Sequence, residues 1–80
     1  MTPELTVYLR EGCSLCEDMV AALAPLQAEL AFGLRVVDVD SDPQLVDAYG
    51  DRVPVLAAPG GELCHYFLDH EMVRRYFAAP

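Results

Sequence analysis

The chain has 80 residues, of which 54% are hydrophobic and 22% charged. A chain of this length buries only about 60% of its unfolded surface on folding. Its apolar content is nevertheless far above that of a disordered segment, so we expect a single domain over residues 1–80. Five arginines and no lysine face 13 acidic residues, for a formal net charge of −8. Nucleic acids and anionic membrane surfaces both bind clustered basic residues, so we exclude these two partners.

The sequence carries no pattern typical of a targeted or membrane-spanning protein. Residues 1–4 lack the positively charged start of a secretory signal. The longest apolar run, residues 19–26, is far shorter than the about 20 residues of a membrane span. We therefore expect a cytoplasmic protein. Three cysteines fit a disulfide scaffold poorly, and in a reducing compartment a close cysteine pair is redox-active or metal-binding rather than structural.

The first part of the chain predicts a strand followed by a long helix. Residues 5–9 alternate apolar and polar side chains and are rich in β-formers, as in a strand. A helix follows from Cys13 onward, because apolar residues then recur at helical spacing; they are Met19, Leu23, Leu26 and Leu30. Pro25 within this helix removes a backbone hydrogen bond, so we expect a kink near residues 21–22.

A second strand and a short helix come next. We expect Gly33 to end the first helix and residues 34–39 to form the second strand. The Ser-Asp-Pro sequence at residues 41–43 supplies a side-chain cap and an early proline, which together mark a helix start. Gly50 then follows Tyr49 as the expected terminator of this helix.

The last part of the chain predicts a hairpin and a final helix. The third and fourth strands are predicted at residues 53–57 and 62–67. The tight turn between them permits only an antiparallel pairing. Asp69 is the expected cap of the final helix. The buried stripe of that helix is predicted to be Val73, Tyr76 and Phe77.

The predicted element order is therefore β-α-β-α-β-β-α, which indicates the α/β class. The crossover between the first two strands should be right-handed, so that these strands are parallel neighbours. One four-stranded mixed sheet flanked by helices is the economical packing of such elements.

The sequence Cys13-Ser14-Leu15-Cys16 lies where the first strand gives way to the first helix. Residues three apart on a helix have neighbouring Cα atoms about 5–6 Å apart, within the range of a disulfide. A cysteine at a helix N-terminus also faces unpaired N–H groups and the positive end of the helix dipole, which lower the pKa of its thiol. We therefore predict that Cys13 is the nucleophilic thiolate and that Cys16, more buried, resolves the mixed disulfide.

Three carboxylates, those of Glu11, Glu17 and Asp18, lie close to this pair in the sequence. Nearby like charges raise the pKa of an acid, which offsets part of the helix-end effect. We therefore expect a moderately lowered pKa for Cys13 and a protein that is not a strong oxidant. Glutathione, itself an anion, should bind less readily at such a site.

Several motifs together resemble a known family. Cys-x-x-Cys opens a helix after a strand, Val53-Pro54 opens a later strand, and Gly60-Gly61 lies in the last hairpin. The chain thus resembles a glutaredoxin within the thioredoxin-fold superfamily. It is similar in particular to the small bacterial glutaredoxin-like proteins, over almost its whole length, in the stretches Tyr8-Leu9-x-x-x-Cys13-x-Leu15-Cys16 and Tyr49-Gly50-x-Arg52-Val53-Pro54-Val55-Leu56.

The resemblance implies a truncated thioredoxin- or glutaredoxin-like fold with a redox-active disulfide that serves electron transfer. It also implies that the Val53–Pro54 peptide bond is cis and faces the cysteines, and X-Pro is the common place for a cis bond. The backbone of Val53 would then be free to pair with an extended substrate. Tyr8 is expected either to line the cysteine pocket or to be a purely structural sheet aromatic.

The sequence also departs from the family pattern. Typical glutaredoxins have Pro-Tyr between the cysteines, where this chain has Ser14-Leu15. They also carry a basic residue near the pair for the glutathione carboxylates, and only Arg10 and Arg52 are available for that role here. Arg52, beside Val53, is the predicted binder of a substrate carboxylate, with a solvated loop arginine as the alternative.

Metal binding is the main alternative for the cysteine pair. Cys64, His65 and His70 could complete the four ligands of a structural zinc site. Adjacent strand residues such as Cys64 and His65 point to opposite faces, however, which argues against a common ion. We predict no metal ligand: Cys64 is a small core residue, with a third redox role as the alternative, and His65 and His70 are a strand surface residue and a first-turn helix residue.

The sequence as a whole predicts a monomeric thiol–disulfide oxidoreductase that acts on protein or small-molecule disulfides through a mixed-disulfide intermediate. It would have no bound cofactor, and glutathione or a reductase would be its external reductant. The alternative function is a non-catalytic thioredoxin-fold module that binds a partner protein or an iron–sulfur cluster.

Overall fold

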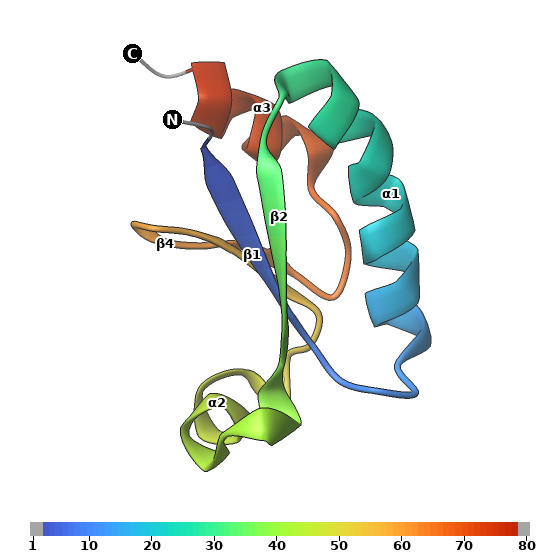
Figure 1. The fold of residues 1–80 in the computed structure, drawn as a ribbon, viewed down its shortest axis with the longest axis vertical. Helices are drawn as coiled ribbons and strands as arrows, with labels where there is room; N and C mark the ends of the chain where they lie inside the picture. The colour runs from blue at the N-terminus through green and yellow to red at the C-terminus, as the bar shows by residue number, and fades with distance from the viewer. Residues whose placement is uncertain (1–2, 79–80) are drawn as a thin grey trace.

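The computed structural model describes residues 3–78 and is shown in Figure 1. Four strands and three α-helices follow one another in the predicted order, with one short 3₁₀ turn, η1, before the second helix. Their bounds are β1 (Glu4–Leu9), α1 (Ser14–Leu30), β2 (Gly33–Asp38), η1 (Val39–Ser41), α2 (Pro43–Tyr49), β3 (Val55–Ala58), β4 (Gly61–His65) and α3 (His70–Ala78).

The strands form one mixed sheet in the order β2-β1-β3-β4. β1 pairs with β2 in parallel, and β3 is antiparallel to both β1 and β4. The predicted α/β fold is therefore confirmed, as are the parallel first pair and the terminal hairpin. Because β3 runs against β1, with Val55 opposite Tyr8, the chain enters β3 at the edge of the sheet where β1 ends.

The hydrophobic core lies between one face of the sheet and the two helices α1 and α3 (Figure 1). Strand alternation directs Leu5 and Val7 to this face, and both are fully buried. The helices contribute fully buried residues as well, among them Leu23 of α1 and Val73 of α3. α2 is packed elsewhere, at the end of the sheet where β2 finishes (Figure 1).

Several strand ends differ from the prediction by one or two residues, and β3 begins at Val55, not at Val53. β4 ends at His65, not at Phe67, because Tyr66 has a positive φ of 63° and turns the chain out of the strand. β2 ends at Asp38, and Val39 begins η1. The Asp38 carboxylate accepts the Asp40 N–H at 2.9 Å, which favours a turn over a longer strand.

α1 runs through Pro25 without interruption, and the kink expected there stays a prediction. The helix ends before Gly33, which is instead the first residue of β2. Its last turn is closed by Ala31 in the left-handed conformation, with φ 56°, whose N–H donates to the Gln27 carbonyl at 2.8 Å. The helix therefore ends at an alanine, in a conformation for which glycine is the usual residue.

α2 begins as predicted but ends for a different reason. Asp42 accepts the Gln44 N–H at 2.9 Å, and Pro43 occupies the first turn. Gly50 follows the helix with an ordinary right-handed φ of −55°, so left-handed freedom is not what the position requires. A Cβ on Gly50 would lie only 2.6 Å from the Val46 carbonyl oxygen, so glycine is needed here for close approach.

α3 is capped by Asp69, as predicted, since its carboxylate accepts the Met72 N–H at 3.0 Å. Val73 is fully buried, and Phe77 stacks on Phe32 with ring centroids 5.1 Å apart. Tyr76, expected in the same stripe, is instead 39% exposed. A helix of nine residues presents only a narrow face to the core, and residues 73 and 77 occupy it.

None of the helices within residues 3–78 is both long and apolar enough to cross a membrane.

The left-handed Ala31 leads to a prediction about stability. Ala31→Gly should raise the free energy of unfolding by about 0.5–1 kcal/mol, because glycine adopts a positive φ without the steric cost that alanine carries. Urea unfolding followed by circular dichroism measures the change.

Ala24→Gly is the matched control, since Ala24 is exposed within α1. That substitution should lower the free energy of unfolding by about 0.5–1 kcal/mol. Equal losses for the two variants would contradict the role assigned to Ala31.

Candidate functional site

The two cysteines are held together by the way α1 begins. β1 ends at Leu9, and Gly12, with φ 77°, turns the chain toward the helix. Cys13 then takes an extended conformation at the N-cap, with φ −99° and ψ 108°. Its Sγ accepts the backbone N–H of Cys16 at 3.1 Å. A thiolate at this position would receive the same hydrogen bond, which favours the charged form.

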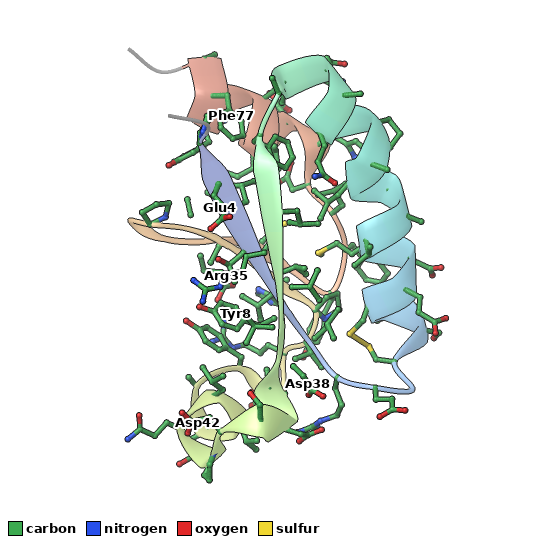
Figure 2. The ribbon with its side chains drawn as sticks, in the orientation of Figure 1. Glu4, Tyr8, Arg35, Asp38, Asp42 and Phe77 are labelled. Atoms are coloured by element: carbon green, nitrogen blue, oxygen red, sulfur yellow. A yellow bond between two sulfur atoms is a disulfide. The ribbon has the colours of Figure 1, made fainter. Side chains whose placement is uncertain are left out.

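Cys13 and Cys16 form a disulfide in the structure, with Cα atoms 5.2 Å apart. Figure 2 shows this bond in yellow beside the first turn of α1. Cys13 is half-buried, whereas Cys16 is only 2% exposed. The proximity predicted from the spacing is therefore confirmed, and the more accessible sulfur is the one predicted to attack.

A cavity of about 500 Å³ borders both cysteines on the side of β2. Its walls are mainly apolar and are formed by Leu9, Val20, Ala21 and Val36. The charged residues around it are Arg10, Glu11 and Glu17. Val36 is 55% exposed, an unusual value for a valine on a strand. The disulfide is thus reached from a surface that is apolar within and acidic at its edge.

The loop before β3 approaches the same end of the sheet. The Val53–Pro54 peptide bond is cis. Pro54 is fully buried and Val53 half-buried, and the register of β3 on β1 places them at the edge where β1 leads to Cys13. The Pro54 carbonyl accepts the Tyr66 N–H at 2.9 Å, which ties the β4–α3 loop to this segment.

Tyr8 does not lie in the cysteine cavity. Val7 points to the α1 side of the sheet, so the next residue points to the other side, where Figure 2 shows Tyr8. There it stacks on Tyr49 of α2, with ring centroids 4.1 Å apart. Burial and the neighbouring Tyr49 raise the pKa of the Tyr8 phenol. Tyr8 is therefore a structural aromatic residue of the sheet, which was the alternative prediction. Leu9, not Tyr8, is the β1 residue that lines the cysteine cavity.

The two candidate anion-binding arginines are both paired with carboxylates. Arg10 makes a bidentate pair with Asp40, with both N–O distances 3.1 Å. Arg52 donates to Glu62 and to the Ala48 carbonyl, and its guanidinium lies 5.9 Å from the centre of the Tyr49 ring. Neither side chain is therefore free to receive a substrate carboxylate without giving up a partner.

Glu62 holds Arg52 and His65 together. Its partial burial raises the pKa of the Glu62 carboxyl, but hydrogen bonds and charge from Arg52 and His65 lower it, and the net direction is down. His65 Nδ1 lies 2.7 Å from a Glu62 oxygen. Glu62 thus stays ionised and keeps both basic side chains on the outer surface of β4.

The later candidate metal ligands are not gathered around the cysteine pair. Within residues 3–78, no group of three or more His, Cys, Asp or Glu side chains is placed to hold a metal ion. Cys64 packs against the core from β4, and burial, as the largest effect, raises the pKa of its thiol, as do the charges of Asp69 and Glu62. His65 is exposed on β4, and His70 is the first residue of α3.

Residues 4–78 match the Glutaredoxin-like domain family (DUF836). The chain belongs to this family. An uncharacterized protein of Mycobacterium tuberculosis is 32% identical over 77 residues, which cover 90% of this chain and 79% of that protein.

Solved structures agree with this glutaredoxin-like assignment. The solution NMR structure of protein Ne2328 from Nitrosomonas europaea is 47% identical, with a TM-score of 0.85 over 95% of this chain and 92% of that one. The X-ray structure of target protein XcR50 from X. campestris is 43% identical, with a TM-score of 0.74 over 95% and 99% of the two chains. Thioredoxin 1 from Thermosipho africanus, at 15% identity and a TM-score of 0.64 over 94% of each chain, shares the fold.

Some residues of this glutaredoxin-like site were not singled out in the sequence. Leu9 and Val36 could have been found from strand alternation, since both lie on the face of Val7. Val20 and Ala21 lie beside the main apolar stripe of α1 and gave no separate signal.

The contrast between the cysteines leads to a prediction about reactivity. In the reduced protein at pH 7, iodoacetamide should modify Cys13 at least about tenfold faster than Cys64, because burial raises the pKa of Cys64 while the helix N-terminus favours the Cys13 thiolate. Peptide mapping by mass spectrometry over time gives the two rates. Faster modification of Cys64 would contradict the assigned accessibility.

The lowered pKa of Glu62 gives a prediction about pH. A group whose folded pKa is depressed stabilises the fold above its unfolded value and loses that contribution as the pH falls through the folded value. Glu62→Gln should therefore lower the free energy of unfolding at pH 7, by at most about 1 kcal/mol. The difference from wild type should shrink as the pH falls below the ordinary carboxyl value of 4.5 and through the lowered pKa of the folded protein. Urea unfolding at a series of pH values measures it.

Arg52→Gln supplies the control for this interaction. In that background Glu62→Gln should have a smaller effect at pH 7, and the double-mutant cycle isolates the coupling between the two side chains. An effect of Glu62→Gln that is the same at pH 3 and pH 7 would argue against the ion pair.

Proposed function

We propose that this glutaredoxin-like protein is a thiol–disulfide oxidoreductase. The observation that carries the proposal is the position of Cys13, half-buried at the N-cap of α1, with its Sγ accepting the Cys16 N–H and its disulfide partner one turn away. This arrangement supplies an activated sulfur that a substrate can reach and a resolving sulfur that it cannot.

In the first step, the Cys13 thiolate attacks one sulfur of the substrate disulfide. A bond forms between that sulfur and Cys13 Sγ, the substrate S–S bond breaks, and the departing thiolate takes up a proton. The Cys16 N–H lies where it would stabilise the attacking thiolate before the reaction.

In the second step, Cys16 attacks Cys13 Sγ and displaces the bound thiol. The two cysteines have then given two electrons to the substrate and are left as the disulfide. Since Cys16 is almost fully buried, it is protected from reacting with other disulfides, and its contact with Cys13 makes the resolving step intramolecular. An external thiol, glutathione or the thiol of a reductase, would return the pair to the reduced form, so the proposal needs no bound cofactor.

The charges around the site favour neutral or cationic disulfides over anionic ones. Glu11 and Glu17 border the cysteine cavity, and Arg10, the basic residue nearest to them, is paired with Asp40. We therefore place protein disulfides and small neutral disulfides before glutathione disulfide among the substrates. The protein is proposed to act as a monomer in the cytoplasm.

The cysteine roles give a prediction about activity. Cys13→Ser should abolish the reduction of 2-hydroxyethyl disulfide and of insulin. Cys16→Ser should leave Cys13 able to form a mixed disulfide, so that 2-hydroxyethyl disulfide reduction with added thiol falls by about tenfold or more but is measurable, while insulin reduction is lost. Rates come from a coupled thiol assay and from insulin turbidity.

Cys64→Ser is the matched control and should keep wild-type rates in both assays. Activity that survives Cys13→Ser would overturn the proposal. A brown protein as purified, with no reductase activity, would favour the alternative of a non-catalytic module that carries an iron–sulfur cluster.

A further inference from the structure

An exposed aromatic segment follows β4. Phe67 is 70% exposed, the largest value among the exposed large hydrophobic residues within residues 3–78, and Tyr66 before it is 39% exposed. Burial of either ring would be favourable, and exposed apolar groups that gather on one surface mark binding sites. The exposed rings therefore indicate a surface that binds a partner.

This segment is held in place by hydrogen bonds. Tyr66 has φ 63°, a conformation that costs a non-glycine residue about 1 kcal/mol or more. Its N–H donates to the Pro54 carbonyl and its hydroxyl to the Asp51 carbonyl, both at 2.9 Å, while the Phe67 N–H donates to the His65 carbonyl at 2.7 Å. The strained turn is thus fixed from two sides, and it leaves the Phe67 ring in solvent.

The aromatic segment faces the first turns of α1 across a groove of about 250 Å³. Leu15, between the two cysteines, lies on the α1 side of the groove, and Tyr66 and Phe67 form the opposite side. This groove is separate from the larger cavity on the β2 side, and the two share no lining residue. Leu15 lies two residues from Cys13, so an extended chain of a few residues that is bound at Cys13 can reach the groove.

The charges near the groove are mostly negative. Asp18 is the acidic residue of its lining and His70 the basic one, and Glu17 lies one residue from Asp18 on the exposed side of α1. The arginines contribute little positive charge here, since four of the five in the chain are paired with carboxylates and Arg35 lies on β2, on the opposite face of the sheet. A cationic side chain on the partner would find a complementary surface.

We propose that the groove between Leu15 and the Tyr66–Phe67 segment binds polypeptide substrates that carry an apolar and a cationic side chain next to their disulfide cysteine. The apolar side chain enters the groove against Phe67, and the cationic one lies near Asp18. This inference rests on the proposed function and gives it a substrate class: extended basic protein segments rather than small anionic thiols.

The binding step can be tested without the chemistry. Three five-residue peptides carry serine in place of the reacting cysteine, flanked by leucine and arginine, by leucine and glutamate, or by glycine and arginine. Their affinities for the oxidised wild-type protein are measured by NMR titration. The leucine–arginine peptide should bind about tenfold more tightly than the glycine–arginine peptide and about threefold more tightly than the leucine–glutamate peptide.

Matched variants locate the two contacts. Phe67→Ser should remove the preference for leucine, whereas Val36→Ser, at another exposed apolar residue beside the other cavity, should leave it unchanged. Asp18→Asn should reduce the preference for arginine, whereas Asp47→Asn on the distant α2 should not. Added salt should weaken the arginine preference but not the leucine preference.

The outcomes separate this inference from the proposed function. Equal affinities for the three peptides, or a leucine preference that Val36→Ser removes and Phe67→Ser retains, would overturn the groove assignment.

The chemistry is measured separately with 2-hydroxyethyl disulfide, which is too small to span the groove. Phe67→Ser should leave this rate unchanged. A wild-type protein that binds the leucine–arginine peptide but reduces no disulfide would overturn the proposed function and support the groove as a peptide-binding surface.

Discussion

The hydrogen bond from the Cys16 N–H to Cys13 Sγ is the interaction on which the site depends. The first turn of any helix leaves N–H groups without partners, and an N-cap side chain normally supplies an oxygen for one of them. Here sulfur takes that place. The same contact that helps α1 to begin therefore also brings the two cysteines together and offers positive charge to the outer one. Local stability and the proposed redox chemistry use the same atoms, so the pair cannot be displaced without disturbing the start of the helix.

The sheet brings the other parts of the site to this helix start. β1 lies between β2 and β3, so the edge where it ends is also where β3 begins. Arg10, which follows β1, connects this edge to η1 and to the end of α2. Its guanidinium pairs with Asp40 and donates to the Gly50 carbonyl at 3.4 Å. A side chain at position 50 would lie 3.2 Å from the Arg10 guanidinium, so the absence of a Cβ there serves this contact as well as the end of α2. The approach to Cys13 is thus set by contacts between segments far apart in the sequence.

The sequence predicted the features that depend on local pattern. Apolar periodicity located the strands and helices, and the caps within residues 41–43 and at Asp69 were recognised because each acts on a residue two or three positions away. The left-handed residues Ala31 and Tyr66 could not be recognised, since glycine is the usual residue at a positive φ and neither alanine nor tyrosine signals that conformation in a sequence. The pairing of Arg52 with Glu62 is likewise a product of the hairpin, and it changes the interpretation of Arg52 from a free cation to a partnered one.

The pairing of arginines with carboxylates determines the charge around the cysteines. If the arginines were free, they would screen the carboxylates around the cysteines and offer anchors for anionic thiols. Instead Asp40, Glu62, Glu29 and Glu71 hold four of them at the periphery. Glu11, Glu17 and Asp18 then dominate the field near Cys13, while the apolar rings after β4 remain uncovered. A surface that repels anions and exposes aromatic side chains suits extended, basic and partly apolar chains. The substrate preference proposed above would then follow from where the few positive charges of this small domain are held.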